Sequence, residues 1–384
     1  MKPVRRTWAE INLDYARQNW EILKAQCGQK AFCPVVKADA YGHGAEKFAT
    51  LYKKLGAKLF AVATLEEALE LHSLGTTKAL VLGYTPPHAA ALLERHRVTQ
   101  TIFDSDYAQA LSANLPPILP DGPLNVHIKL DTGMGRLGFN CRSMAAAKES
   151  VQEIVKACRL PGLCPTGIYT HFATADTTDE HSLRFLQEQY QRFSYVVGEI
   201  KKFYPHITAH CANSATALSA PQIKSDLCRM GIVLYGLSPD IHFPLPQGLK
   251  PVMCLKTQVS MLKTIAAGDC VGYGCTYQAS GPRTVATLPV GYADGYRRDL
   301  SNKGYVLIGG QKAPVIGRVC MDQTMVDVTG LQVALQDEVI LFGDSAGQLS
   351  ADHLAELCGT IGYEIVCGIS KRVPRLYIQN GELL

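Results

Sequence analysis

The sequence lacks the cysteine patterns that mark zinc modules and disulfide frameworks. It contains 13 cysteines, an odd number, and no two of them stand at C-x-x-C spacing. Cys33, Cys211 and Cys228 lie within apolar runs, where a thiol behaves as a small hydrophobic group. We therefore expect reduced thiols, a cytoplasmic protein and no metal site.

Long apolar segments and strong charge are missing as well. The longest stretch without Asp, Glu, Lys or Arg, residues 203–223, contains two prolines and two histidines, so we expect no membrane span. The first ten residues carry charges without a following apolar segment, so we expect no export signal. The net charge is +4 and basic residues occur only in short pairs, which argues against a nucleic-acid partner.

From residue 13 to about residue 236, short apolar runs alternate with segments of helical periodicity. The clearest helix carries apolar residues at three- and four-residue spacing from Leu183 to Tyr204, and Thr64 to Glu67 resemble a capping box. The apolar runs mostly do not alternate with polar residues, which is typical of parallel strands buried on both faces. About eight strand–helix units predict an α/β (β/α)8 barrel, although a doubly wound sheet shows the same alternation. The expected strands are 31–37, 58–63, 79–82, 98–103, 125–130, 166–171, 207–211 and 228–235.

The pattern changes after residues 238–251, which contain four prolines and no periodicity and which we interpret as a domain junction. Short strands separated by turns follow, with one helix near 351–358, and they predict a mostly β domain. We expect a barrel at 1–245, whose first ~12 residues could instead pack on the second domain, and a C-terminal β domain at 246–384. The expected strands are 255–265, 284–289, 305–308, 313–319, 325–328 and 338–342.

Polar side chains follow the expected barrel strands at their carboxyl ends, where barrel enzymes place their active sites. A lysine at the end of an apolar strand is desolvated, which lowers its pKa and makes its amine a usable nucleophile. An isolated lysine more often reaches solvent, but the repetition over five strand ends favours a site. The residues concerned are Lys37, Asp39, Tyr41 and His43, then Lys129, Asp131 and Arg136, then His171, then His210, Asn213 and Ser214, and finally Arg229 before Gly231.

Residues 133–138 (GMGRLG) match the G-x-G-x-x-G pattern of a dinucleotide site. Such a site needs an acidic residue about 20 positions further on to hold the ribose. Residues 157–160 read ACRL and contain no carboxylate, and Arg136 stands where the pyrophosphate should approach. The motif therefore does not favour a nicotinamide cofactor.

An ordered set of motifs, which runs from residues 8–10 (WAE) to 372–375 (RVPR), resembles the alanine racemase family. Any one motif could be accidental, whereas the ordered set is very specific. Asp39 is a departure, because the family commonly has asparagine there. The remaining motifs are 35–44 (VVKADAYGHG), 127–136 (HIKLDTGMGR), 169–173 (YTHFA), 210–214 (HCANS), 229–232 (RMGI), 271–274 (VGYG), 290–296 (VGYADGY), 320–322 (CMD) and 362–365 (GYEI).

The resemblance implies pyridoxal 5'-phosphate, held as an imine on Lys37. It also implies that Arg229 faces the pyridine nitrogen with support from His171. An arginine keeps its proton, so it donates a hydrogen bond without protonating the ring, and we infer that this disfavours transamination. Asn213 belongs to the same cofactor site, and the phosphate falls to Tyr41, Ser214, Gly231, Ile232 and Tyr363.

The family's chemistry further implies interconversion of L- and D-alanine, which supplies D-alanine for peptidoglycan, by two bases on opposite faces of the substrate. Lys37 would act on the D-alanine side and Tyr273, from the partner subunit of a homodimer, on the L-alanine side. A phenol has an ordinary pKa of ~10, so cationic surroundings must lower that of Tyr273. Arg136 and the backbone of Met321 would bind the substrate carboxylate. Tyr292, Cys320 and Asp322 would complete the substrate site, and Lys129 matches a lysine that can be carbamylated.

Three other functions remain to be weighed. A racemase that prefers serine or accepts many side chains would share these motifs, although Tyr363 narrows the space beside the substrate methyl group. A decarboxylase of the same architecture would carry a Gly-Gly-Gly phosphate loop, where this chain has Gly231. A barrel that only carries the cofactor would lack the β domain, which this chain retains.

Overall fold

A computed structural model describes residues 6–28, 30–73, 75, 78–344 and 346–384. The chain divides into two compact units, here named the barrel unit (Leu23–Ala40 and Ala45–Gly231) and the β unit (Met1–Ile22, Tyr41–Gly44 and Ile232–Leu384). Residues 1–5, on which the expected absence of an export signal partly depends, lie outside the described residues. Across the described ranges, no helix is both long and apolar enough to cross a membrane.

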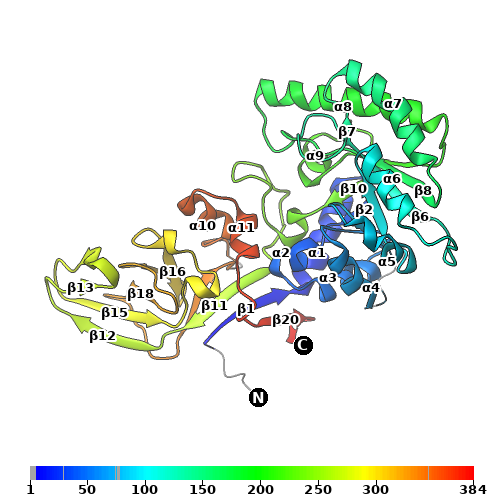
Figure 1. Ribbon diagram of the computed structural model, residues 1–384. Helices are drawn as coiled ribbons and strands as arrows, with labels where there is room; N and C mark the ends of the chain where they lie inside the picture. Colours follow the sequence, from blue (N-terminus) through cyan, green and yellow to red (C-terminus); the bar gives the residue numbers. More distant parts are fainter. Residues whose placement is uncertain (1–5, 29, 74, 76–77, 345) are drawn as a thin grey trace. The chain divides into compact units, whose positions relative to one another are not determined.

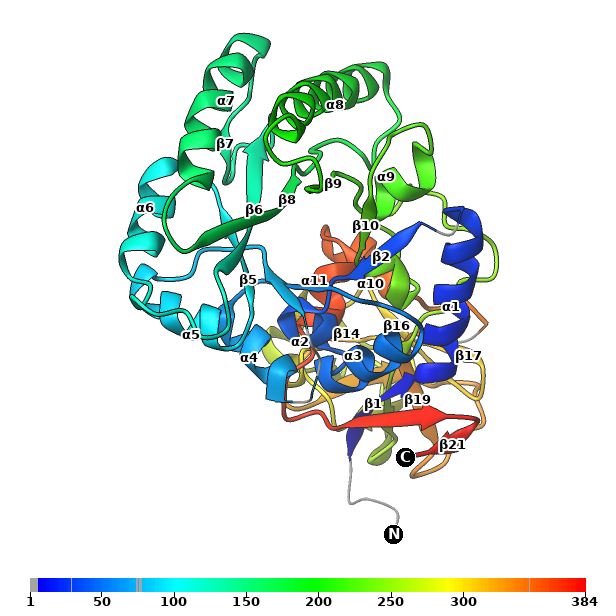
Figure 2. The ribbon, with the colours of Figure 1, turned by 90° about the vertical axis from the view of Figure 1, so that its right-hand side faces the viewer.

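In the described part of the barrel unit, eight parallel strands follow one another around a ring (Figures 1 and 2). Hydrogen-bonded ladders join β3, β4, β5, β6, β8 and β9 in that order, and β10 pairs with β2. A bridge between Val35 and Ala61 joins β2 to β3, and the Arg229 N–H donates to the Ala212 carbonyl (2.9 Å) between β9 and β10, which closes the ring. The strands are β2 (Ala31–Pro34), β3 (Phe60–Val62), β4 (Ala79–Val81), β5 (Thr99–Ile102), β6 (Leu124–Asp131), β8 (Leu163–Tyr169), β9 (Thr208–His210) and β10 (Leu227–Met230).

Helices follow the strands and lie on the outside of the ring, as α5, α6 and α7 show in Figure 2. The long helix α8 (Glu180–Lys201) confirms the predicted apolar stripe in part, since Leu186, Phe193 and Ile200 are buried whereas Leu183 is 50% exposed. Asp179 caps this helix by accepting the Ser182 N–H (3.0 Å). The other helices are α3 (Ala45–Lys54), α4 (Leu65–Ser73), α5 (Ala90–Arg95) after the 3-10 turn η1 (Pro87–Ala89), α6 (Ser105–Ala113), α7 (Met144–Cys158) and α9 (Ser214–Ser219), and β7 (Phe139–Asn140) pairs with β6.

The β unit contains two larger sheets. The seven-stranded sheet has the order β17-β16-β19-β11-β1-β20-β21, and the three-stranded sheet has the order β12-β15-β18. The N-terminal strand β1 (Thr7–Asn12) pairs antiparallel with β11 and parallel with β20. The remaining strands are β11 (Met253–Gln258), β12 (Met261–Ile265), β13 (Cys270–Val271), β14 (Tyr277–Gln278), β15 (Arg283–Leu288), β16 (Tyr305–Ile308), β17 (Gln311–Pro314), β18 (Thr324–Asp327), β19 (Glu338–Phe342), β20 (Arg375–Gln379) and β21 (Glu382–Leu383).

Short helices complete the β unit, and the division between the units passes through two helices, α1 (Leu13–Gln26) and α2 (Lys37–Gly42). The predicted helix at 351–358 is confirmed as α10 (Ala351–Cys358), which Ser350 caps through the His353 N–H (3.0 Å). A further helix, α11 (Gly362–Cys367), was not predicted. The 3-10 turns are η2 (Ile232–Tyr235), η3 (Tyr273–Cys275), η4 (Tyr292–Asp294) and η5 (Arg298–Leu300).

The predicted fold class, a (β/α)8 barrel with a mostly β C-terminal domain, is confirmed, but several strand predictions were wrong in extent, among them 313–319, where β17 covers Gln311–Pro314. The strand expected at 228–235 ends at Met230, because residues 232–235 turn into η2, and an apolar run has no period that separates these states. The strand expected at 255–265 is two strands in different sheets. Ser260, between them, donates its N–H and hydroxyl to the Thr287 carbonyl (2.9 and 2.8 Å), which turns the chain into the second sheet.

Candidate active site

Arg229, on β10, lies in the centre of the barrel and is 4% exposed. Its guanidinium donates to the Thr170 carbonyl (2.8 Å) and lies 2.9 Å from Nδ1 of His210 and 3.3 Å from Nδ1 of His171. Further contacts reach the carbonyls of His210 (3.2 Å) and Cys211 (3.4 Å). The backbone carbonyls and imidazoles at the ends of β8 and β9 therefore fix this cation in one orientation.

A second layer of polar groups lies beside Arg229. Nε2 of His210 is 3.0 Å from Nδ1 of His127, and the Tyr169 ring stacks on His210 at a centroid distance of 4.9 Å. The Tyr169 hydroxyl is 2.9 Å from that of Thr101. Burial, followed by the charge of Arg229, lowers the pKa of His127 to about 3 and holds the pKa values of His171 and His210 well below the ordinary range. These imidazoles are therefore neutral near neutral pH.

Lys129, on β6, is 4% exposed, and its Nζ has no hydrogen-bond partner among the described residues. The amine lies 5.0 Å from the centroid of the Tyr169 ring. Burial, then the charges of Arg229 and Arg136, hold the pKa of Lys129 well below its ordinary value. This shift favours the neutral form of the amine, which is a nucleophile and not a counter-ion.

Lys37 does not end a strand, as the sequence suggested, but begins α2 three residues beyond β2. The following residues, Ala38 to Tyr41, all have φ between 52° and 54°, so this turn is left-handed. L-residues adopt that conformation at a cost of about 1–2 kcal/mol each, so neighbouring groups must hold the turn.

Two carboxylates hold the left-handed turn. Glu67 accepts the Ala38 N–H and the Ala63 N–H, both at 2.7 Å. The predicted capping box is therefore formed only on the Thr64 side, where the hydroxyl accepts the Glu67 N–H (3.3 Å). Asp39 accepts the Ala45 N–H (2.7 Å), which gives the residue that departs from the family pattern a structural role.

Ser214 and Gly231 come together at the ends of β9 and β10. The Ser214 hydroxyl accepts the Gly231 N–H (2.9 Å), so its own proton can point elsewhere. Asn213 caps α9, where its side-chain oxygen accepts the N–H and hydroxyl of Thr216 (2.8 and 2.9 Å). These groups fit a phosphate, because a hydroxyl and backbone N–H groups at the ends of adjacent strands can converge on its oxygens.

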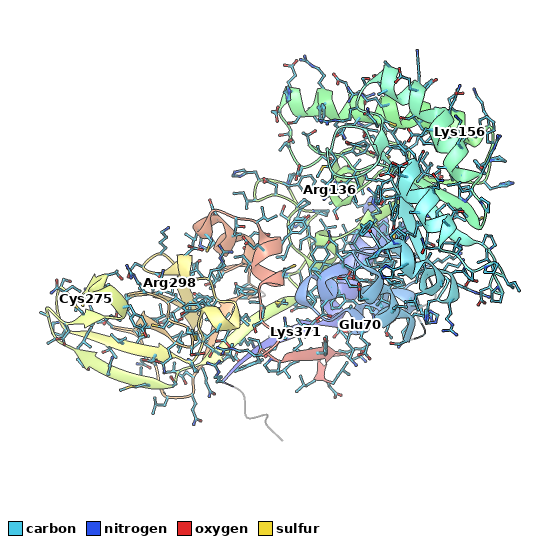
Figure 3. The ribbon with its side chains drawn as sticks, viewed as in Figure 1. Glu70, Arg136, Lys156, Cys275, Arg298 and Lys371 are labelled. Atoms are coloured by element: carbon cyan, nitrogen blue, oxygen red, sulfur yellow. The ribbon has the colours of Figure 1, made fainter. Side chains whose placement is uncertain are left out.

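The G-x-G-x-x-G segment folds as a loop after β6, and its glycines serve that loop. Asp131 accepts the N–H groups of Gly133 (3.1 Å) and Gly135 (2.9 Å). A Cβ on Gly138, where φ is +134°, would lie 2.3 Å from the Asp131 nitrogen. Arg136 is exposed on this loop, which Figure 3 shows at its label. The motif is therefore a tight turn, in agreement with the sequence argument against a dinucleotide.

In the β unit, Tyr41 lies between two other tyrosines. Its ring centroid is 5.2 Å from that of Tyr235 and 5.8 Å from that of Tyr363. Tyr41 and Ile232 are both buried. Two residues expected at the phosphate, Tyr41 and Tyr363, are therefore neighbours although they are distant in sequence.

The residues expected from a partner subunit lie on exposed segments of the β unit. Tyr273 is 70% exposed, Met321 53% and Tyr292 43%. The Tyr292 N–H donates to the Cys320 carbonyl (3.0 Å), so the segments that carry Tyr292, Cys320 and Met321 are adjacent. A Cβ on Gly291 would lie 2.2 Å from the same carbonyl, which explains the glycine there.

Asp322 takes part in an ion-pair network that the sequence reasoning missed. Arg372 donates to Asp322 (2.6 Å) and to Asp294 (2.7 Å), and Arg6 donates to Asp294 (3.0 Å). Asp294 is 1% exposed and also accepts the Gly291 N–H (2.9 Å). Asp294 and Arg372 lie within the motifs 290–296 and 372–375. The opposite charges in these two motifs were the sequence signal that could have predicted the network.

The barrel unit thus brings Lys129, His171, Arg229, Ser214 and Gly231 to the carboxyl ends of its strands. Such a centre, in one chain with a mostly β unit, defines a barrel enzyme with an accessory β domain. The model of the alanine racemase N-terminal domain matches residues 11–239, and the model of its C-terminal domain matches residues 252–377. The chain belongs to the alanine racemase family, whose members are isomerases that use pyridoxal 5'-phosphate.

Relatives match over almost the full length of the chain. The alanine racemase of Desulfovibrio desulfuricans is 43% identical over 380 residues, which cover 98% of this chain and 99% of that protein. The solved alanine racemase of Clostridium difficile 630 has a TM-score of 0.89 at 37% identity, with coverage of 100% and 98%. That of Bacillus anthracis, solved with bound L-Ala-P, has a TM-score of 0.90 at 34% identity and the same coverage.

The buried histidines predict loss of stability in acid. Because the folded pKa of His127 is about 3 and the unfolded value is ~6.5, only the unfolded chain binds a proton between these pH values. Stability should therefore fall by about 1.4 kcal/mol per pH unit for this residue as the pH drops below ~6.5. The free energy of unfolding, measured with urea from about pH 5 to pH 7, should depend less steeply on pH in His127→Gln than in the wild type. His181→Gln, at an exposed position, is the matched control, and equal slopes in all three proteins would contradict this account.

Proposed function

We propose that this protein interconverts L- and D-alanine in the cytoplasm and supplies D-alanine for peptidoglycan. The observation that carries the proposal is the buried Arg229, which groups at the ends of β8 and β9 hold at the centre of the barrel. An arginine opposite the pyridine nitrogen donates a hydrogen bond but does not give up its proton. Protonation of the substrate carbon itself is then favoured over transfer of the proton to another carbon.

Pyridoxal 5'-phosphate, when bound, supplies an electron sink that acidifies the Cα–H of an amino acid. Lys37 would hold it covalently, and Arg229 with His171 would face its ring nitrogen. Asn213 would act by capping α9 so that Ser214 is in position. The phosphate of the coenzyme would bind to Tyr41, Ser214, Gly231, Ile232 and Tyr363.

Two side chains of the protein move the proton. Lys37 would take it from D-alanine or deliver it there, and Tyr273 would do so on the L-alanine side. We infer that Tyr273 comes from a second copy of the chain, so that a homodimer carries two shared sites. Its exposure of 70% supports this inference, because a tyrosine that serves a site in its own subunit has no reason to face solvent.

The substrate carboxylate would bind to Arg136 and to the backbone N–H of Met321. Arg136 is exposed in the single chain, which fits a residue that a substrate and a partner subunit would cover after assembly. Tyr292, Cys320 and Asp322 would border the substrate from the same partner subunit. The Asp294–Arg372 network positions Asp322, because Arg372 bonds to both carboxylates.

Lys129 would carry a carbamate that orients Arg136. Burial lowers the pKa of Lys129 and so favours the neutral amine, which is the form that adds to carbon dioxide. The product is an anion that can pair with an arginine. With ¹³C-labelled bicarbonate, we expect a carbamate signal in the NMR spectrum of the wild-type protein. Lys129→Arg should lack it, whereas Lys148→Arg, at an exposed position of α7, should retain it. A signal of equal size in Lys129→Arg would rule out this site.

Borohydride should fix the coenzyme to the protein at Lys37. Reduction bleaches the visible band of an internally bound coenzyme and leaves it covalently attached, so a peptide that contains residue 37 should carry its mass. Lys37→Ala should carry no such adduct and should not support growth of a bacterial strain that requires D-alanine. Covalent labelling at another lysine would contradict the assignment.

Tyr273→Phe should separate the two faces of the reaction. The variant should still bind the coenzyme, but exchange of the α-proton of L-alanine with solvent should slow by about 100-fold or more, and that of D-alanine much less. NMR measurement of deuterium incorporation into each enantiomer checks this. Tyr277→Phe is the matched control, because its ring packs in the core of Val271, Val285 and Ile316. Equal losses for both enantiomers would refute the role of Tyr273.

Mixing two inactive variants tests the shared site. If Tyr273 serves the partner subunit, a heterodimer of Lys37→Ala and Tyr273→Phe chains has one site with both bases intact. Activity should therefore appear when the two variants are unfolded, mixed and refolded together. Absence of recovery, with heterodimers detected by mass spectrometry, would show that both bases belong to one chain.

A further inference from the structure

A hollow of about 1050 Å³, here named the amino-end hollow, lies in the barrel unit at the end opposite the proposed active site. Its lining includes the first residues of four parallel strands, Thr99 of β5, Leu124 of β6, Thr208 of β9 and Leu227 of β10. Its volume is close to the upper end of the ~300–1000 Å³ that small-molecule pockets occupy. Barrel enzymes place their active sites at the carboxyl ends of the strands, so the proposed function leaves this hollow without a role.

The mouth of the amino-end hollow is basic. Lys58, Lys78 and Arg95 line it, and all three are exposed. Among the residues that the structure places, none of the three has an ion-pair partner. Their charges are therefore available to a ligand that enters from solvent.

A fourth cation, Arg97, stands at the mouth in a backbone conformation that favours glycine. It follows α5 with a φ of 52°, in the left-handed region that glycine usually occupies after a helix. Its guanidinium donates to Asp121 (2.8 Å), and the buried Glu94 accepts the Asp121 N–H (3.3 Å). The two carboxylates of the lining therefore already have partners, and the cations outnumber them.

The floor of the amino-end hollow reaches the polar centre of the barrel. His127, which is 4% exposed, belongs to the lining. Its Nδ1 is 3.0 Å from Nε2 of His210, whose Nδ1 is 2.9 Å from the Arg229 guanidinium. Nε2 of His127 is therefore the nitrogen that remains for a ligand. An anion beside it would be attracted by the buried charge of Arg229, because attraction between charges is strong in a medium of low dielectric constant.

A second imidazole in the lining has a nitrogen that the protein does not use. Nδ1 of His96 is buried and has no hydrogen-bond partner among the described residues. The His96 ring, which follows α5, meets the ring of His72 on α4 edge to face at a centroid distance of 4.8 Å, where the two helices lie side by side (Figure 2). Buried polar nitrogens normally have a partner, so this one indicates a ligand with hydrogen-bonding groups.

We propose that the amino-end hollow is a binding site for a small organic phosphate. A phosphate carries a charge of about −1.5 to −2 near neutral pH and several acceptor oxygens, which suits several cations and imidazole N–H donors better than a single carboxylate would. Leu59 and Leu227 in the lining offer apolar surface to the organic part. In the proposed dimer the partner subunit approaches the carboxyl ends of the strands, so this end stays open to solvent. That access rests on the proposed function.

Calorimetric titration of the coenzyme-loaded protein with phenyl phosphate tests the site, at an ionic strength that potassium chloride holds constant. We expect a single class of saturable sites and an affinity about 10-fold higher than for inorganic phosphate, because the ring buries apolar surface. Lys58→Ala and Arg97→Gly should each weaken binding by about 10-fold, since each removes a charged donor. Glycine suits the backbone at position 97, so this variant should fold as the wild type does.

Two matched controls separate the site from general effects. Gln336→Gly makes the same backbone change at a φ of 70° in the β unit, and Lys148→Ala removes an exposed charge from α7, so both should bind phenyl phosphate as the wild type does. Absence of saturable binding, equal affinity in Arg97→Gly and the wild type, equal weakening in Lys148→Ala, or tighter binding of inorganic phosphate would overturn the proposal.

One further variant separates this site from the coenzyme site. Loss of phenyl phosphate binding in Ser214→Ala but not in Arg97→Gly would place the anion where the coenzyme phosphate is proposed to bind, and would also overturn the proposal. Because the titration measures binding and not racemisation, a protein that binds phenyl phosphate here but racemises no alanine would keep this site while the proposed function failed. A racemase without this binding would show the reverse.

Discussion

The structure of the barrel unit depends on a single positive charge buried at its centre. Arg229 is surrounded by backbone carbonyls and imidazoles, and none of its hydrogen bonds within the described residues goes to a carboxylate. An uncompensated cation in a low-dielectric core disfavours any second one. Burial, and then the charge of Arg229, lowers the pKa values of the histidines around it and of Lys129. The centre of the barrel carries the charge of Arg229 and a group of neutral donors and acceptors.

A site of this kind is prepared for an anion. A carbamate on Lys129 would supply negative charge beside Arg229, whose described hydrogen bonds reach no carboxylate. Asp131 braces the loop that carries Arg136. Binding of the coenzyme and folding of the barrel should therefore be coupled through electrostatics.

Both proposed bases stand beside backbone of positive φ. Lys37 precedes a left-handed turn that Glu67 and Asp39 hold, and Tyr273 lies between Gly272 and Gly274 in a hairpin. Strained backbone persists where the surroundings determine it, and it fixes the direction of a side chain more narrowly than a loop would. Carboxylates hold the first turn, whereas the second depends on two glycines of positive φ.

The alternation of apolar runs and helical periods was enough to predict the barrel, its eight strands and the mostly β domain, because burial on both faces of a parallel sheet leaves a local pattern. The motifs were likewise sufficient to identify the family, and the roles that they imply for Lys37, Arg229 and Ser214 stay predictions. Periodicity could not place β1 between β11 and β20 or turn 232–235 into a 3-10 helix, since pairing partners and backbone direction leave no local pattern. The hydrogen bond from the Ala38 N–H to Glu67 and the Asp294–Arg372 network were decided by tertiary structure alone. Each depends on which distant segments pack together, and that is a property of the folded chain.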